Sequence, residues 1–600
     1  MMTLAFSGLI AGALLLVADG PAFAGDTPPS PAATTVPGRA DARLQALYDR
    51  EWGWRQQEFG RSDRGDDVGS DRLPHVDANT QAAHLAYWTQ ALNELDQIPV
   101  SQLSPEEKIN AEVFRRSVQT LADDARFKTY EAPFNADTFF WSSLAPRRSL
   151  HSVKAYRNYI ARMRDIPRYF EEQIANMQAG LQRGFSVPRV VVIGRDKTIE
   201  PFVATDRGNP FYAPFQAFPA SIPAADQAAL KTEADQVIQQ SVVPAYRTLL
   251  AFIRDVYMKQ ARTTLAAEQE PDGKAFYQSQ IEAFTTLNLT AEQIHAMGLK
   301  EVARISAEME QTKAQTGFKG NMPAFLKFLR TDPQFYPKTP QELLGFSSYV
   351  AKRVDGKLAE TIGFLPRRRF SIIPVPADLA PIYTGGRGGV ESCMMNTYDL
   401  PSRPLYTLTA LTLHECNPGH AFQAAVALEA IRRPAFRRAT GFSGYGEGWA
   451  LYMEWLGTKM GVYDTPYENF GRLSYEIWRA CRLVIDTGIH HDGWTRQQAQ
   501  QYLRDHTALS EHEIETEVDR YIAWPGQALA YKLGEMLIRQ KRAEAEAKLG
   551  PAFDQRAFHD AILALGQVPL STLRERLDQF IADGGKNPPG WNPALPEYEK

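Results

Sequence analysis

The chain has 600 residues, a mass of 67.2 kDa, 44% hydrophobic residues and 23% charged residues, which are the proportions of a globular protein with a sizeable core. The 66 Lys and Arg residues against 70 Asp and Glu residues give a net charge of −4, so no overall positive field exists to hold nucleic acid, and we expect no such partner. Three cysteines are too few for a disulfide framework, and we expect no structural disulfide.

The N-terminal residues 1–24 predict a secretory signal peptide. Residues 4–17 are almost all apolar, and Ala22-Phe23-Ala24 supplies the small-x-small pattern of a cleavage site. The apolar run is shorter than the roughly 20 residues that cross a bilayer. No cysteine lies near the cleavage site, so we expect no membrane anchor after signal removal. Residues 25–39 are rich in Pro, Ala and Thr and predict a flexible linker, so the sequence indicates a periplasmic or secreted protein.

The remaining chain, residues 40–600, is dominated by the apolar periodicity of helices. Capping boxes that begin at Thr290, Thr495 and Ser510 mark the starts of three of them. No internal repeat interrupts this pattern. The sequence therefore predicts a mainly α fold.

Two short segments, residues 187–193 and residues 369–375, are rich in β-branched residues and predict strands. Residues 380–403 contain several glycines and little periodicity, and are expected to form a loop. The predicted fold thus includes only a small β-sheet.

His414, Glu415 and His420 form the clearest chemical motif of the chain. Many zinc hydrolases have a His-Glu pair followed by a second His, in which two imidazoles bind the metal and the Glu activates water. His420 lies six positions after His414, which is about 120° around and about 9 Å along an ideal helix, so a straight helix cannot present both to one ion. Pro418, which has no N–H, and Gly419 are expected to break the helix and bring His420 back.

Glu447 is the predicted third metal ligand. It lies 27 residues after His420 at the start of a predicted helix, and a His, His, Glu set leaves one zinc position open. Glu454 is on nearly the same helical face and is expected to accept a hydrogen bond from a ligand imidazole. The alternative is that His414 and His420 are ordinary core or helix-end histidines and that Glu447 is a first-turn carboxylate favoured by the helix dipole.

Four segments carry a resemblance to a known family: HECNPGHAFQ at residues 414–423, GYGEGWALYMEWLG at 444–457, RACRLVIDTGIHHDGWTRQQA at 479–499 and RYIAWPGQALAYKLGE at 520–535. They resemble the bacterial domain-of-unknown-function-885 family, DUF885, with its pattern H-E-x-x-P-G-H-x-x-Q and E-G-W-A-L-Y. Residues 271–302 are the clearest match in the N-terminal half. That family is in turn similar to the large helical zinc metallopeptidases of the angiotensin-converting enzyme, thimet oligopeptidase and thermostable carboxypeptidase types.

The resemblance implies a large two-lobed helical metallopeptidase-like fold with a deep cleft. The N-terminal lobe would span about residues 40–285 and the metal-site lobe about residues 286–600, with one zinc ion per chain. The sequence departs from the family pattern at Cys416 and Asn417, where the family often has Gly or Ala followed by an aromatic residue. A thiol at this position would be a soft ligand close to the metal.

Arg479, Arg482, Asp486 and His490 lie close to one face of a predicted helix. An arginine in a cleft can bind the terminal carboxylate of a peptide through two parallel hydrogen bonds, so Arg479 and Arg482 are predicted to bind substrate. The alternative for Arg482 and Asp486, four residues apart, is an intrahelical ion pair.

Three residues are candidates to donate a hydrogen bond to the oxyanion of peptide hydrolysis: His490, Tyr531 and Tyr521. We assign His490 and Tyr531 as catalytic and Tyr521 as substrate-binding. The alternative for the tyrosines is that they pack in the core. Trp524-Pro525-Gly526 is expected to end a helix and direct the Tyr531 segment toward the site.

These residues predict zinc-dependent hydrolysis of peptide bonds in oligopeptides, either carboxypeptidase-like or internal. Glu415 would take a proton from water and pass it to the leaving amine. The strand at residues 369–375 precedes the metal helix and is expected to pair with an extended peptide. Two alternatives remain open, namely a non-peptide amide or ester hydrolase with the same metal site and a non-catalytic peptide-binding protein. No pattern in the sequence indicates the oligomeric state.

Overall fold

The computed structural model describes residues 38–60, 69–146, 150–377, 380–429 and 433–587. The predicted signal peptide and nearly all of the predicted linker lie outside these residues. The first helix, α1 (Arg39–Glu58), begins one residue before the predicted start of the folded body. Among the described residues, no helix combines the length and the apolar character that crossing a bilayer requires.

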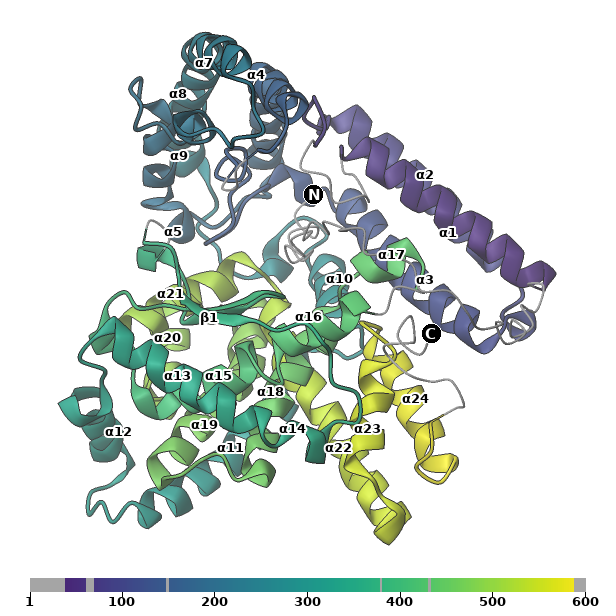
Figure 1. Cartoon of the computed structure of the whole chain (residues 1–600), viewed down its shortest axis with the longest axis vertical. Coiled ribbons are helices and arrows are strands. Elements are labelled where there is room, and N and C mark those ends of the chain that lie inside the picture. The colour runs from purple at the N-terminus through teal and green to yellow at the C-terminus, as the bar shows by residue number, and fades with distance from the viewer. Residues whose placement is uncertain (1–37, 61–68, 147–149, 378–379, 430–432, 588–600) are drawn as a thin grey trace, which may run out of the picture.

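The described chain is mainly helical, as predicted, and its helices form three groups (Figure 1). The N-terminal group consists of α1, α2 (Ala78–Asp96) and α3 (Pro105–Arg126). The second group, at the top of Figure 1, consists of α4 (Val153–Arg183), α5 (Arg189–Val192), α6 (Ala213–Gln216), α7 (Ala224–Val237), α8 (Val243–Phe252) and α9 (Met258–Gln260).

The third and largest group contains the sheet and the metal motif. Before the sheet it consists of α10 (Gly273–Thr285), α11 (Ala291–Gln315), α12 (Met322–Thr331), α13 (Pro340–Asp355) and α14 (Leu358–Thr361). After the sheet it consists of α15 (Leu405–Glu415), α16 (His420–Glu429), α17 (Ala435–Ala439), α18 (Ser443–Met460), α19 (Pro466–His490), α20 (Arg496–His506), α21 (Glu511–Ala523), α22 (Ala530–Leu549), α23 (Gln555–Leu563) and α24 (Leu570–Ala582).

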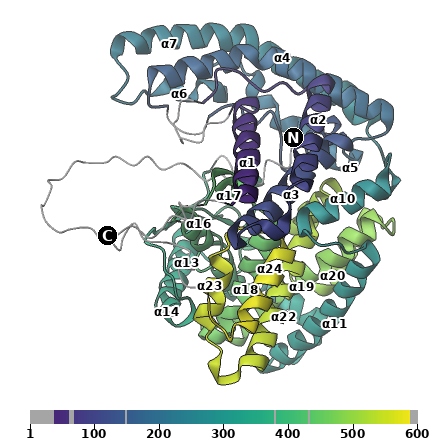
Figure 2. The same cartoon turned by 90° about the vertical axis from the view of Figure 1, so that its right-hand side faces the viewer.

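Two large hydrophobic cores hold these groups together. The first packs the helices α4–α9 against α11, α12 and α19–α21. The second packs α1–α3 against α18 and α22–α24, as Figure 2 shows for the purple and yellow ends of the chain. Each core therefore joins segments from both sides of residue 285, where the resemblance places a lobe boundary, and that boundary stays a prediction.

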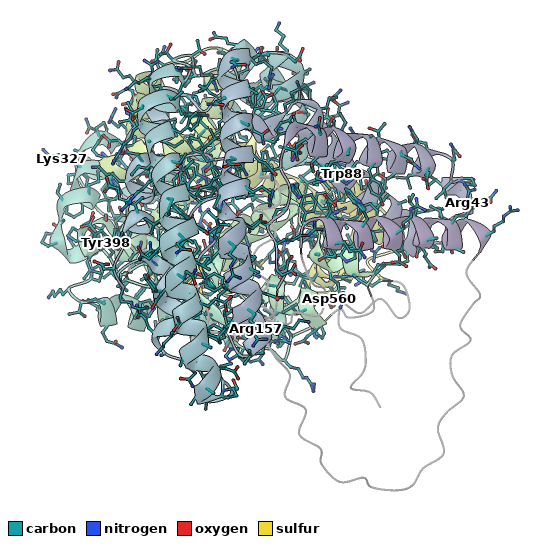
Figure 3. All side chains as sticks on the ribbon, turned by 90° about the horizontal axis from the view of Figure 1, so that it is seen from above. Arg43, Trp88, Arg157, Lys327, Tyr398 and Asp560 are labelled. Atoms are coloured by element: carbon teal, nitrogen blue, oxygen red, sulfur yellow. A yellow bond between two sulfur atoms is a disulfide. The ribbon has the colours of Figure 1, made fainter. Side chains whose placement is uncertain are left out.

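The N-terminal helices illustrate how local signals and burial agree. Asp77 caps α2 by accepting hydrogen bonds from the amides of Asn79 and Thr80. Trp88 of α2 lies between the two helices of the α1–α2 pair (Figure 3), and its indole N–H donates to Glu51 of α1 over 3.3 Å. A buried tryptophan needs such a partner for its N–H, so this bond fixes how α2 lies against α1.

All three predicted capping boxes are present. Thr290 begins α11, Thr495 begins α20 and Ser510 begins α21, and in each the side chains of the first and fourth residues bond reciprocally to the backbone. These motifs are confirmed because the interaction depends on residues only three apart.

The sheet has three strands in the order β1-β3-β2. β1 (Ser371–Pro374) pairs in parallel with β3 (Ser392–Met395), and β2 (Gly386–Gly388) pairs antiparallel with β3. The strand predicted at residues 369–375 is confirmed as β1. The glycine-rich residues 380–403, expected to be a loop, contain both other strands.

The strand predicted at residues 187–193 is wrong. Those residues contain the short helix α5, which begins directly after Pro188. Val191 and Val192 are fully buried in the first core. A single helical turn buries these β-branched side chains as well as a strand would, because burial and not a partner strand decides the conformation here.

Cys393 of β3 and Cys416, the residue after α15, form a disulfide across 23 residues. The expectation of no structural disulfide is therefore wrong. Cys481 is the free cysteine and is buried in α19. Because its sulfur is bonded to Cys393, Cys416 is not available as a soft metal ligand.

A thiol count tests this disulfide. Unfolded but unreduced protein is expected to show one free thiol, and reduced protein three. Replacing Cys393 and Cys416 by Ala together is expected to lower the free energy of unfolding by about 2–4 kcal/mol, because the loop becomes free in the unfolded chain. Urea unfolding measures this loss, with Cys481→Ala as the control for removal of a buried sulfur. Three thiols before reduction would contradict the pairing.

Candidate metal centre

The helix that carries His414 ends where the sequence predicts a break. α15 ends at Glu415, and α16 begins at His420. The indole N–H of Trp449, on α18, donates to the carbonyl of Pro418 over 2.9 Å and so holds the connection between the two helices. The break turns His420 back toward His414, with 4.9 Å between the ring centroids.

Two glycines allow this connection to pack tightly. A Cβ atom on Gly419 would lie 1.8 Å from the carbonyl oxygen of His414. A Cβ atom on Gly388, in β2, would lie 1.8 Å from the carbonyl oxygen of Glu415 and 2.8 Å from Cβ of His420. Only glycine fits at either position, because separations under about 3 Å do not occur between such atoms.

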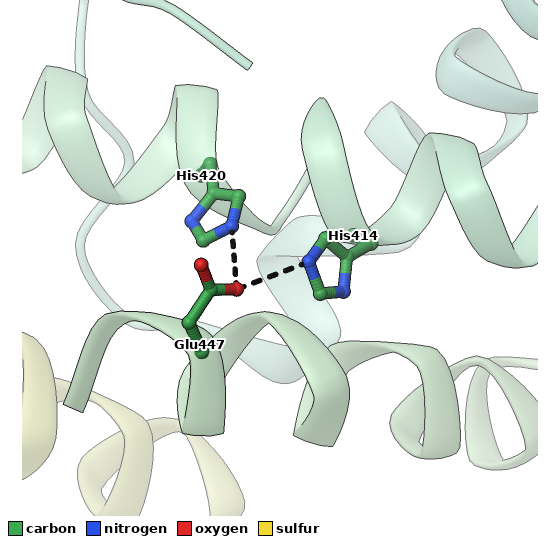
Figure 4. A group of neighbouring side chains, drawn as sticks. All are labelled: His414, His420 and Glu447. Atoms are coloured by element: carbon green, nitrogen blue, oxygen red, sulfur yellow. Dashed lines mark ion pairs between the residues drawn. The ribbon is translucent and has the colours of Figure 1, made fainter. Parts of the chain in front are cut away.

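The three predicted ligands meet at one point (Figure 4). Oε2 of Glu447 lies 3.4 Å from Nε2 of His414 and 3.3 Å from Nε2 of His420. Donor atoms about 2.0–2.2 Å from a tetrahedral zinc ion are roughly 3.3–3.6 Å apart. Oε2 of Glu447 is also buried, and it has no hydrogen-bond partner in the described part of the chain. The residues present therefore fit a zinc ion.

Glu454 has the role that its spacing predicts. Its Oε1 is 2.7 Å from Nδ1 of His414, which leaves Nε2 to face Glu447. Burial lowers the pKa of His414, but the nearby carboxylates of Glu447 and Glu454 outweigh it and raise this pKa to about 10. Burial raises the pKa of Glu447, and the neighbouring His420 and His414 bring it well below its usual range. The centre thus favours a positive charge between these side chains.

Glu415 lies at the edge of this centre and is held by the sheet. One oxygen of its carboxylate accepts a hydrogen bond of 2.8 Å from the amide of Gly388. The strand beside the metal helix is therefore β2. β1, which corresponds to the strand predicted to pair with peptide, lies on the far side of β3.

If the peptide hydrolysis predicted from the sequence is correct, Gly388→Ala reduces its kcat/KM by about 100-fold, since a new methyl group would displace Glu415 and His420 by an ångström or more. Peptide hydrolysis and zinc content together measure the effect. The matched control is Gly345→Ala, because a Cβ atom at Gly345 meets nothing within 4 Å. Unchanged activity in Gly388→Ala would show that the close approach of β2 is not needed.

Residues 56–577 match the model of a family described as "Bacterial protein of unknown function (DUF885)". The chain belongs to this family. Its sequence is 27% identical to that of a protein from Colwellia psychrerythraea, described as a candidate lipoprotein, whose crystal structure is known. The two structures match with a TM-score of 0.81 over 91% of this chain and 99% of that chain.

A candidate lipoprotein of unknown function from Shewanella oneidensis is 19% identical, with a TM-score of 0.67 over 90% of this chain and 99% of that chain, and it shows the same fold. No curated protein matches. The DUF885 resemblance read from the sequence is thus confirmed. The further similarity to zinc metallopeptidases stays a prediction.

In this DUF885 protein, the predicted substrate-binding arginines lie inside the molecule. Arg479 is 5% exposed, and its guanidinium is 3.8 Å from Oε1 of Glu454, so it lies behind His414. Arg482 is 2% exposed and donates to the hydroxyl of Tyr521 over 3.0 Å. It also pairs with Glu517 over 2.8 Å. These contacts already engage the guanidinium of Arg482 and the hydroxyl of Tyr521.

The proposed ion pair between Arg482 and Asp486 is not formed. The carboxylate of Asp486 instead accepts hydrogen bonds from the hydroxyl of Tyr277 and the amide of Gly526. Burial raises the pKa of Asp486 to about 7.

His490 is fully buried, and both of its ring nitrogens face the backbone. The amide of Ala267 donates to Nδ1 over 3.1 Å, and Nε2 donates to the carbonyl of Tyr521 over 2.9 Å. Burial lowers the pKa of His490 to about 3, so the ring is neutral. It therefore has no N–H left for an oxyanion. It is also about 16 Å along α19 from Arg479, the residue of that helix that approaches the metal centre.

Tyr531 packs with Leu451, which lies one helical turn after Glu447 on α18. The guanidinium of Arg482 stacks on its ring at 4.2 Å, and Arg520 is 3.4 Å from its hydroxyl. α21 ends at Ala523, as the Trp524-Pro525-Gly526 signal predicts. Tyr531 thus remains the candidate to donate to an oxyanion.

Two contributors to the centre, Gly388 and Trp449, were not predicted. The glycine-rich stretch was the available signal for Gly388, but glycine alone does not show which backbone atoms approach it. Trp449 is part of the E-G-W pattern, but its position in the sequence does not indicate that its indole N–H bonds to the carbonyl of Pro418.

Proposed function

We propose that this protein hydrolyses peptide bonds in oligopeptides with a zinc ion bound by His414, His420 and Glu447. The observation that carries the proposal is the meeting of these three donors beside Glu415, at separations that suit tetrahedral zinc. A His, His, Glu set is typical of catalytic and not structural zinc sites, because it leaves a position for water.

A zinc ion at this centre would polarise water and the scissile carbonyl. The residues of the chain then have separate tasks. Glu415 accepts a proton from the attacking water and delivers it to the leaving amine, while Gly388 holds one of its oxygens in place. Glu454 fixes the tautomer and orientation of His414. Tyr531 is the candidate to stabilise the oxyanion.

Access to the centre is from the side of His420 and Glu447. Their side chains are 24% and 15% exposed, whereas that of His414 is 3% exposed. Substrate can therefore reach the open position while the ligand nearest the core stays shielded.

The proposed location is outside the cytoplasm. A buried disulfide is typical of oxidising compartments. Both similar structures are described as candidate lipoproteins, whose usual place is a bacterial envelope. We therefore propose a periplasmic or secreted protein.

Elemental analysis combined with a hydrolysis screen tests the function. We expect purified protein to contain zinc and to cleave unstructured oligopeptides, to lose activity with a chelator and to regain it with zinc. Cleavage of small amides or esters alone would favour the non-peptide hydrolase. Peptide binding without zinc and without cleavage would favour the non-catalytic alternative.

A further inference from the structure

A small cavity with a mixed polar and apolar lining lies near the metal centre, where the sheet, α15, α19 and the start of α21 meet. Its volume is about 40 Å³, which is room for about three water-sized groups. Among the residues that line it are Gly385, Arg403, Thr407, Leu411, Tyr475 and Glu513. The buried arginines of α19, Arg479 and Arg482, are not among the residues that line this cavity.

Arg403 is the cationic group of this cavity, and its charge is incompletely paired. Its Nε is buried and has no hydrogen-bond partner among the described residues. Its nearest acidic neighbour is Glu513, with 3.9 Å between Nη1 and Oε1. The other oxygen of Glu513 is held by the amide and hydroxyl of Ser510 in the capping box of α21. An arginine with an unused donor beside a cavity is suited to a carboxylate.

The cavity lies close to Glu415. Gly385, on its wall, precedes Gly386, where a Cβ atom would lie 3.5 Å from Cγ of Glu415. Leu411, on the same wall, is one helical turn, or about 6 Å, before Glu415 on α15. An extended peptide advances about 3.3–3.6 Å per residue, so a group at this distance belongs to the first or second residue beyond the cleaved bond.

We propose that this cavity is a substrate subsite in which Arg403 binds a carboxylate on the leaving side of the cleaved peptide bond. The inference rests on the proposed hydrolysis and deepens it by naming the substrate class, peptides that carry a negative charge one or two residues after the cleaved bond. A carboxylate has three heavy atoms, which matches the room available. It comes from the C-terminus of the peptide or from an acidic side chain, and the two sources are separable by experiment.

Binding to zinc-loaded Glu415→Gln protein, measured by titration calorimetry, tests the subsite without turnover. The peptides are acetyl-Phe-Ala-Ala as the free acid, its C-terminal amide, and acetyl-Phe-Ala-Glu as the amide. We expect the free acid to bind about 10- to 150-fold more tightly than its amide, the factor for a charge-assisted hydrogen-bonded pair. Recovery of tight binding by the Glu-containing amide assigns the subsite to side chains as well. Weak binding of that peptide restricts it to the C-terminus. Equal binding of all three overturns the proposal.

Variants introduced into the Glu415→Gln background connect the preference to Arg403. Arg403→Gln is expected to abolish the acid-to-amide ratio, and Glu513→Gln to increase it, because Gln keeps the capping box while the competing charge is removed. Arg403→Gln alone leaves the carboxylate of Glu513 without its cationic neighbour. The double variant Arg403→Gln with Glu513→Gln removes both charges, and it replaces the single variant if Arg403→Gln does not fold. Arg387→Gln, an exposed arginine of β2, is the matched control and is expected to keep the ratio. An unchanged ratio in the double variant overturns the proposal.

This binding experiment separates the two proposals. If the wild-type protein hydrolyses peptides but acid and amide bind equally, the subsite is wrong and the hydrolase stands. If the acid binds tightly through Arg403 but no peptide is cleaved, the hydrolase is wrong and Arg403 belongs to a carboxylate-binding site of a peptide-binding protein.

Discussion

Glu415→Gln is expected to lower the turnover of a susceptible peptide by about 10²- to 10⁴-fold, the usual contribution of a positioned general base. Gln has the same size as Glu and keeps an oxygen for the Gly388 amide, but it cannot accept the proton of the attacking water. The fold and the zinc content should therefore be unchanged. Steady-state kinetics, elemental analysis and thermal unfolding measure the three quantities.

The matched control for this variant is Glu391→Gln, an exposed glutamate between β2 and β3. It removes the same charge close to the centre without touching Glu415 and should leave turnover unchanged. Full activity in Glu415→Gln would remove Glu415 from the mechanism. Loss of zinc from that variant would instead make Glu415 a ligand.

Alanine at His414, His420 or Glu447 is expected to weaken zinc binding by more than the roughly 10- to 100-fold typical of losing an outer partner, and to abolish hydrolysis. Two protein ligands hold zinc poorly, and Glu447 faces His414 at 3.4 Å and His420 at 3.3 Å. Zinc content after dialysis against a competing chelator measures the loss for each variant.

Another cluster of possible metal ligands, made of a His, an Asp and a Glu, provides the control for these variants. His75, Asp77 and Glu172 also bring their donor atoms together, but His75 is exposed and Arg168 already donates to Glu172 over 2.7 Å. His75→Ala is therefore expected to leave the zinc content unchanged. If zinc persisted in His420→Ala and disappeared in His75→Ala, the metal would belong to this second group.

The part of the structure that the sequence predicts best depends on short-range spacing. The capping boxes, the helix break at Pro418 and the placing of Glu454 on the same helical face as Glu447 each involve residues a few positions apart or on one helix. The ligand set was predicted from the residue types and spacing that zinc sites use. The contacts that bring α18 to α15 and α16 are long-range, and the sequence did not indicate them.

The errors occur where distant packing decides. Cys393 and Cys416 gave no local sign that β3 would lie against the end of α15. The predicted substrate face of α19 failed for a different reason. That helix is buried on almost every side between Phe470 and His490, so an arginine on any of its faces points into protein. Periodicity identifies faces only on helices that have one exposed side.

The composition of the second core has a consequence for the order in which the protein assembles. Helices α1–α3 bury their apolar sides against α18 and α22–α24, all of which begin more than 300 residues after the end of α3. During synthesis these first helices have no final partner until almost the whole polypeptide exists. We therefore expect slow folding governed by late, long-range contacts, and an emerging chain that depends on chaperones. The same delay is compatible with the proposed export. An N-terminal segment that has not yet packed into its core can cross a membrane unfolded before the rest of the protein folds.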